Sequence, residues 1–163
     1  MRTYRGPILP QPARCRLLPL FHGQFVFGLL VSIVNVAIQA GATVTVIRAG
    51  RMVGRRLPRR HAVKALIAIM ASSGTLLTIT HLIQVAVWAG AYIIVGETNF
   101  QDSYFVAFTD FTTIGSQIRT NADWRLLGPI AAANGMLMFG WSTAVLFAVL
   151  SKAIEILKLM KLH

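Results

Sequence analysis

The chain is short of charge, of acidic residues and of cysteine, and each shortage excludes a class of protein. Only 13% of its 163 residues are charged, and five acids stand against 16 lysines and arginines, so the net charge is +11. A soluble nucleic-acid-binding domain this basic would carry more charge and fewer apolar residues, so we expect no nucleic-acid partner. The lone cysteine, Cys15, excludes an intrachain disulfide framework and a cysteine-rich metal site.

Catalytic motifs are also missing from the sequence. It contains no Gly-x-Ser-x-Gly turn, no Walker motif and no dinucleotide fingerprint, and no nucleophile–base set can be named. The histidines show no metal-ligand spacing; they are His22, His61, His81 and His163. We therefore expect no enzyme, no cofactor and no bound metal other than an ion in passage.

Long apolar runs dominate what is present. Apolar residues make up 55% of the chain, and its mean hydropathy is +0.63. A soluble core of this length would not bury so much apolar surface. Three runs carry no charge and exceed the ~20 residues that a bilayer requires, at residues 17–47, 65–96 and 126–151. We expect an all-α integral membrane protein with three transmembrane helices.

These runs divide the chain into five segments. Pro19 interrupts the first run, so we place the first transmembrane helix after it. In the last segment the charged residues recur about every three positions, as in an interfacial amphipathic helix. The segments are a basic N-terminal segment (1–20), the first transmembrane helix (21–47), an arginine-rich link (48–64), a unit with the second and third runs (65–151) and an amphipathic tail (152–163).

The charges between the runs are sorted by sign. The link holds six arginines and no acid: Arg48, Arg51, Arg55, Arg56, Arg59 and Arg60. Four of the five acids lie between the second and third runs: Glu97, Asp102, Asp110 and Asp123. Because basic segments stay in the cytoplasm, the link and the tail are expected inside and the acidic segment outside. The arginines either only orient the chain or also bind anionic lipid headgroups.

The N-terminal segment leaves alternatives open. Three spans place it outside, although four arginines precede the first span: Arg2, Arg5, Arg14 and Arg16. A basic leader, an apolar run and the small residues Ala40, Gly41 and Ala42 also fit a signal peptide loosely, but this run is longer than usual. The link has the denser charge, so we let it set the orientation.

A half-length helix is predicted between the second and third runs. Residues 100–111 are apolar and aromatic, and either Thr98 or Asn99 can cap a helix there. Aromatic residues at spacings of four, four and three form one face: Phe100, Tyr104, Phe108 and Phe111. Twelve helical residues span ~18 Å, about half a bilayer. Such a helix at membrane depth needs protein or water around it, which is typical of a re-entrant pore helix.

A filter-like sequence follows this helix directly: Thr112, Thr113, Ile114, Gly115, Ser116 and Gln117. A span, a half-helix, Thr-Thr-Ile-Gly and a final span together resemble the pore domain of potassium channels. The sequences Trp-Arg-Leu-Leu-Gly-Pro, Ala-Asn-Gly and Phe-Gly-Trp-Ser-Thr within residues 124–143 resemble the last helix of small bacterial three-span ion-channel-domain proteins, the two-pore-domain-like potassium channels. The resemblance covers about residues 80–150 and implies a pore domain at 65–151.

In that family the filter reads Thr-x-Gly-Tyr-Gly, and its carbonyls replace the hydration shell of the ion. Thr113, Ile114 and Gly115 match the first three positions, whereas Ser116 and Gln117 replace the tyrosine and the second glycine. A glutamine resists the positive φ that a glycine adopts freely. The resemblance therefore implies a homotetrameric pore whose altered outer filter reduces potassium selectivity, passes cations unselectively or does not conduct.

Two features favour cations over anions. The C-terminus of the half-helix carries roughly half a negative charge and would point at the pore. Asp110 and Asp123 place acidic charge at the outer mouth, and Asp110 could also brace the filter by a hydrogen bond.

Polar and small residues inside the runs supply further candidates. Gly135 and Gly140 are either a gating hinge or sites of close helix packing. His81 and Gln84 lie one turn apart within the second run. They are either a functional intramembrane pair or a hydrogen-bonded neutral pair.

The sequence thus predicts a potassium-channel-like cation channel in the cell inner (plasma) membrane. Its permeant ions would be monovalent cations such as potassium, its partner copies of itself, and its lipid contacts anionic headgroups at the arginine link. The alternative is a non-conducting membrane scaffold or accessory subunit that kept the fold and lost the filter, motivated by Ser116 and Gln117.

Overall fold

A computed structural model describes residues 11–56, 62–96, 99–115 and 124–161. These residues form four helices: α1 (Gln11–Arg56), α2 (Ala62–Ile94), α3 (Phe100–Phe111) and α4 (Leu127–Lys161). Three contain stretches long and apolar enough to cross a membrane: His22–Met52, Leu66–Ile94 and Leu127–Glu155. The predicted all-helical class is confirmed, and so are three helices long and apolar enough to span, which indicate a multi-pass membrane protein.

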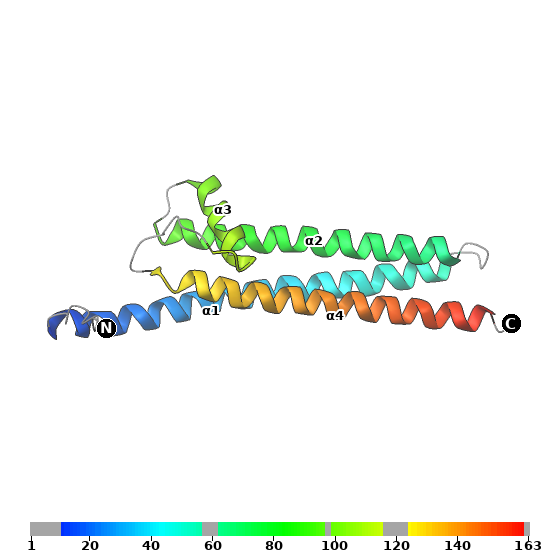
Figure 1. Cartoon of the computed structure of the whole chain (residues 1–163), viewed down its shortest axis with the longest axis horizontal. Helices are drawn as coiled ribbons and strands as arrows, with labels where there is room; N and C mark the ends of the chain where they lie inside the picture. The colour runs from blue at the N-terminus through cyan, green and yellow to red at the C-terminus, as the bar shows by residue number, and fades with distance from the viewer. Residues whose placement is uncertain (1–10, 57–61, 97–98, 116–123, 162–163) are drawn as a thin grey trace, which may run out of the picture.

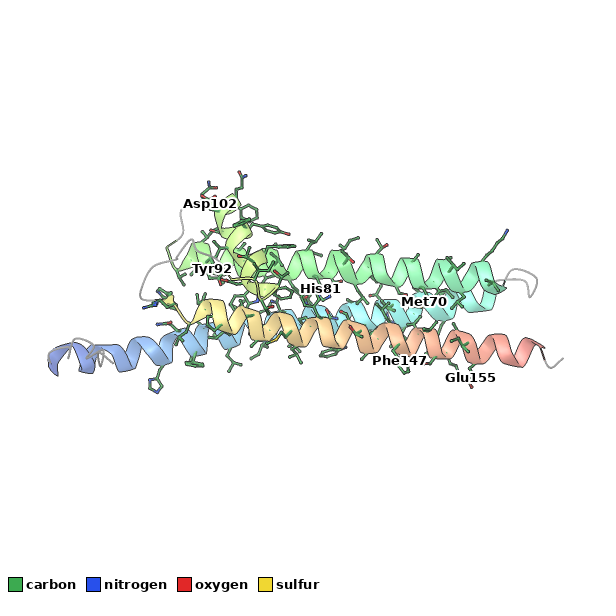
Figure 2. All side chains as sticks on the ribbon, viewed as in Figure 1. Met70, His81, Tyr92, Asp102, Phe147 and Glu155 are labelled. Atoms are coloured by element: carbon green, nitrogen blue, oxygen red, sulfur yellow. The ribbon has the colours of Figure 1, made fainter. Side chains whose placement is uncertain are left out.

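The three long helices lie side by side along the long axis of the molecule (Figure 1). α1 and α4 run in the same direction and α2 runs against them, and each of these helices packs on the other two. The short α3 lies at one end, where it packs on α2 and α4. Asp102 near the start of α3 and Glu155 near the end of α4 lie toward opposite ends of the bundle (Figure 2), and the first turns of α1 extend beyond α3 (Figure 1).

The helix bounds differ from the expected segments at α1. α1 begins at Gln11 and continues through Pro19, whereas we expected the helix to begin at residue 21. A proline inside a helix removes one backbone hydrogen bond, and here the helix remains continuous across that loss. Its membrane-length stretch still begins at His22, close to the predicted start. At the other end, the tail continues α4 as a helix to Lys161, as predicted.

α3 has the predicted bounds because its ends are specified locally. Asn99 is in an extended conformation (φ −122°, ψ 125°), and its Oδ1 accepts a hydrogen bond from the backbone N–H of Gln101 at 3.0 Å. This is the N-cap interaction that satisfies one of the free donors of a first helical turn. Of the two predicted caps, Asn99 fills the role, and Thr98 lies outside the described residues.

The main core gathers at the α3 end of the bundle. Its largest buried side chains come from three helices: Trp88 and Tyr92 of α2, Phe111 of α3, and Leu127 and Met138 of α4. A smaller cluster joins Val46, Leu77 and Val145 nearer the opposite end. Large apolar side chains remain exposed on each long helix, as in Leu29, Ile67 and Phe147. In a spanning bundle such faces contact lipid hydrocarbon. Lipid chains are as apolar as these side chains, so no protein partner is needed to cover them.

Candidate functional site

The C-terminal turn of α3 contains the first four residues of the predicted filter, Thr112 to Gly115. The N–H of Thr113 donates to the carbonyl of Asp110, and the N–H of Ile114 donates to the carbonyl of Thr109, each at 2.9 Å. These two bonds form a Schellman closure, in which the residue after the cap is left-handed. That residue is Thr113, with φ +65°. A β-branched residue in this region is an outlier, since the position usually holds glycine.

The residues of the turn after Thr112 lie at the surface of the chain. Thr113, Ile114 and Gly115 are exposed, and Ile114 reaches 75% exposure. Gly115 has φ +77°, and its N–H also donates to the carbonyl of Thr109, at 3.1 Å. Among the described residues, no hydrogen bond uses the carbonyls of Thr113, Ile114 or Gly115. Within the described ranges the turn therefore carries carbonyl acceptors that no N–H or O–H group bonds, and carbonyl oxygens are the groups that replace water around a cation.

Three of the predicted site residues have no described position. Ser116, Gln117 and Asp123 lie outside the described residues, so the outer end of the predicted filter and one predicted mouth acid have no described position.

The carboxylate of Asp110 is held between two other helices. The Tyr92 hydroxyl of α2 donates to Asp110 Oδ2 at 2.6 Å, a short and strong bond of the charge-assisted kind. On the other side lies Gly128 in the first turn of α4, where an added Cβ would stand 3.1 Å from Oδ2. The hydrogen bond from Tyr92 ties α3 to α2, and Tyr92 is the partner that sequence reasoning missed. The bracing of the filter by Asp110 stays a prediction.

The two glycines of α4 differ in their surroundings. Gly135 is buried, and a Cβ there would collide with the backbone carbonyl of Phe111 at the end of α3. At Gly140 an added Cβ would meet nothing within 4 Å. Close helix packing was one of the two interpretations of these glycines. Within one chain, Gly135 packs closely and Gly140 does not.

A layer of buried polar side chains joins the three long helices just beyond the end of α3. His81 and Gln84 belong to it, as one reading of that pair predicted, and sequence reasoning missed most of their partners. The other members of the layer come from all three helices: Asn35 and Gln39 of α1, Trp88 of α2, and Asn134 and Ser142 of α4. The four-residue spacing of Asn35 and Gln39 within an apolar run was a signal that could have found two of them.

Four members of this layer form a closed ring of hydrogen bonds. His81 Nδ1 contacts Gln84 Oε1 at 2.9 Å, and Gln84 Nε2 donates to Gln39 Oε1 at 3.2 Å. Gln39 Nε2 donates to Ser142 Oγ at 2.8 Å, and Ser142 Oγ contacts His81 Nε2 at 3.0 Å. We call these four residues the polar ring.

The direction of the polar ring follows from one fixed donor. Gln84 Nε2 also donates to the backbone carbonyl of Asn35 at 3.1 Å, and a carbonyl can only accept. Gln84 Oε1 must then face His81, so His81 donates from Nδ1, and its Nε2 faces the Ser142 hydroxyl. An imidazole with its single proton on Nδ1 would complete the ring by accepting at Nε2 from that hydroxyl.

A second branch of the layer leaves one oxygen unpaired. Trp88 Nε1, which can only donate, reaches Asn134 Oδ1 at 3.2 Å, and Asn35 Nδ2 donates to the same oxygen at 3.0 Å. Asn35 Oδ1 is then buried without a partner among the described residues. This branch adds a second link between α1, α2 and α4.

Aromatic contacts connect the polar ring to α3. The His81 ring lies 4.6 Å from that of Phe139 and 6.2 Å from that of Phe111, and the two phenylalanine rings meet edge to face at 5.6 Å. Figure 2 shows His81 on α2 beside the end of α3. The last residue of α3 therefore rests on His81 through its side chain and on Gly135 through its backbone.

Charged side chains at the opposite end include the described part of the arginine link. Arg48 and Arg51 on α1 and Lys64 on α2 are exposed, and Lys152 forms an exposed ion pair with Glu155 at 2.8 Å. Arg59 and Arg60 lie outside the described residues. Within the described part of the chain, no group of three His, Cys, Asp or Glu side chains could hold a metal ion.

The fold defines a helical membrane protein with three spans and a half-length fourth helix. Comparison with family models, with curated proteins and with solved structures finds no match to the chain.

Proposed function

We propose that the chain is the subunit of a tetrameric, potassium-channel-like pore that passes monovalent cations across the plasma membrane. The observation that carries the proposal is the end of α3, where a half-length helix ends in an exposed turn whose carbonyls have no hydrogen-bond partner in the described part of the chain. α3 spans ~18 Å and packs on two long helices, as a re-entrant helix supported by protein would. In this proposal α4 lines the inner vestibule.

The electrostatics of the turn favour a cation. The C-terminus of a helix carries roughly half a negative charge, and α3 has no basic residue in its last turn to neutralise it. The exposed carbonyls of Thr113, Ile114 and Gly115 continue this negative end. A single chain offers an ion only one such turn, so coordination from several sides requires further copies around an axis.

The rival proposal is a non-conducting scaffold or accessory subunit, and one observation favours it. The N–H groups of Ile114 and Gly115 both bond to Thr109, so the chain turns back on α3 at this point. A filter needs successive carbonyls directed at one axis. Ser116 and Gln117 in place of Tyr and Gly favour the same rival.

Ion flux separates the two proposals. Purified protein is reconstituted in liposomes, its oligomeric state is measured by native mass spectrometry, and potassium and sodium fluxes are compared with protein-free liposomes. A tetramer with cation flux supports the channel. A tetramer silent to both ions contradicts the channel and supports the scaffold.

A matched glycine pair tests whether flux passes through the turn. At Gly115 and at Gly74 an added Cβ meets nothing within 4 Å, but only Gly115 has a positive φ. Gly115→Ala is therefore expected to reduce the flux by straining the turn, whereas Gly74→Ala in helix α2 is expected to leave it unchanged. Equal flux in both variants would contradict a conducting role for the turn.

Anionic lipid is the proposed partner of the opposite end. Arg48 and Arg51 are three residues apart on α1, so they share one exposed face at the end of the spanning stretch. Basic residues near a membrane surface attract anionic headgroups by about 1 kcal/mol each. Replacing both arginines with glutamine should reduce the phosphatidylglycerol retained by the purified protein, and unchanged retention would leave them as orientation signals only.

A further inference from the structure

We infer that the polar ring makes α1 a positioning part of the pore, because it holds α2 and α4 in the arrangement that fixes the C-terminal end of α3. The inference rests on the proposed function for its effect on ions, but the positioning itself is independent of conduction. A minimal pore domain needs only two spans and a half-helix, so α1 requires an explanation of its own.

The polar ring crosses all three long helices. Gln39 of α1 accepts from Gln84 of α2 and donates to Ser142 of α4, so its one amide bridges two helices. Gln39 and Gln84 have no exposed surface, so neither amide can exchange its partner for water. Loss of one partner leaves a buried polar group unpaired, which costs more than the bond itself contributes.

The polar ring also contacts α3, through His81. His81 receives the Ser142 hydroxyl on one nitrogen and packs its ring against Phe111 and Phe139. The orientation of the imidazole is set at both nitrogens, so the surface under Phe111 is fixed by the ring. Phe111 is the residue immediately before the turn that begins at Thr112.

α4 contacts Phe111 independently of His81. Gly135 lies against the backbone carbonyl of Phe111, and Ser142 lies two turns further along α4. A shift of α4 after loss of the Ser142 bonds would therefore reach Phe111 through both its backbone and its side chain. Gln39, Ser142 and His81 act on the turn through Phe111 and touch no ion themselves.

The decisive variants form a neighbouring pair on α4. Ser142 donates and accepts within the ring, whereas the Thr143 hydroxyl donates to the Phe139 carbonyl of its own helix. Ser142→Ala opens the ring, and Thr143→Val removes the hydroxyl of the next residue, which is exposed, without touching the ring. Gln39→Leu opens the ring from α1 at nearly constant volume.

The readout is the accessibility of the turn. Ile114→Cys in a Cys15→Ser background places one thiol at an exposed position, and its labelling rate with a water-soluble maleimide is measured in the purified protein in nanodiscs. Ser142→Ala and Gln39→Leu are each expected to change this rate about three- to tenfold, because each removes two interhelical hydrogen bonds. Thr143→Val is expected to label at the parent rate.

A combined variant distinguishes one shared ring from two separate structural defects. If both residues act through the ring, Gln39→Leu with Ser142→Ala changes the rate less than the product of the single effects. Multiplying effects would overturn the shared ring. A parent rate in Ser142→Ala would overturn the inference as a whole.

The ion readout distinguishes failure of this inference from failure of the proposed function. Where the parent protein conducts, Ser142→Ala should change its potassium-to-sodium flux ratio and Thr143→Val should not, and an unchanged ratio in Ser142→Ala would overturn the effect on ions. If the parent protein passes no ion, the proposed function fails, and the labelling rates still decide whether α1 positions the turn.

Discussion

Gly135 of α4 lies so close to Phe111 of α3 that a Cβ on the glycine would collide with the phenylalanine carbonyl. The contact joins the middle of a spanning helix to the last residue of the half-length helix. Carbonyl groups and small residues meet in this way where two helices approach closely in a membrane. The position of the α3 end thus depends on the absence of a side chain.

Gly135→Ala is expected to destabilise the protein by about 1–3 kcal/mol, since either α3 or α4 must move to admit the methyl group. Thermal unfolding in detergent measures the change. Gly140→Ala is the control, because it meets no neighbour and gains helix propensity. Equal melting temperatures for the two variants would contradict the close contact at Phe111.

Tyr92→Phe removes the donor that holds Asp110 at 2.6 Å. The expected loss of stability is about 1.5–3 kcal/mol, the range for a hydrogen bond to a charged group. Tyr104→Phe removes a weaker bond, from a tyrosine hydroxyl to the Leu82 carbonyl at 3.3 Å, and should cost less. If Tyr104→Phe proves the more damaging of the two, the bracing role of Tyr92 is wrong.

Thr113→Gly is expected to stabilise the chain by about 1 kcal/mol, because the left-handed conformation at φ +65° is strained for a β-branched residue. Thr112, at φ −87°, has an ordinary conformation, and its hydroxyl donates to the Phe108 carbonyl at 2.7 Å. Thr112→Gly should therefore destabilise. Unfolding of both variants under the same conditions tests the sign, and destabilisation by both would refute the left-handed turn.

Nitrogen NMR of labelled histidine is expected to show a proton on Nδ1 of His81 and a hydrogen-bonded lone pair on Nε2. The reason is that Gln84 presents an acceptor to Nδ1 and Ser142 a hydroxyl to Nε2. In Ser142→Ala the preference for this tautomer should weaken. A proton on Nε2 in the parent protein would reverse the assigned direction of the polar ring.

Ser116→Tyr combined with Gln117→Gly restores the two filter positions at which the sequence departs from Thr-x-Gly-Tyr-Gly. If those positions limit selectivity, the double variant should pass potassium over sodium more selectively than the parent. The liposome assay with both ions measures the ratio. An unchanged ion preference would count against the alignment of residues 113–117 with a filter.

Much of the architecture was predictable because its causes are local in the sequence. The length of an uncharged apolar run decides whether a helix can cross a bilayer, and three such runs became α1, α2 and α4. α3 has its predicted bounds because a side chain two residues from Gln101 caps it. The tail could also be predicted as helix. Pro19, by contrast, did not delay the start of α1 to residue 21.

The candidate site was predictable only in part. The segment that carries the turn and the pair of His81 and Gln84 could be found from residue type and spacing. Their partners could not, because Tyr92 lies 18 residues from Asp110 and Gln39 lies 103 residues from Ser142. A polar residue in an apolar run shows that it needs a partner, but not which helix supplies one.

The sequence by itself therefore determined the three spans, the half-length helix and the separation of basic from acidic segments, since each follows from composition within a short stretch. Only the tertiary structure decided that α1 joins the other spans through Gln39, and that Phe111 rests on Gly135 and His81. Those contacts depend on the register of packed helices. In a membrane, a buried amide or hydroxyl must find its partner on whichever helix lies beside it.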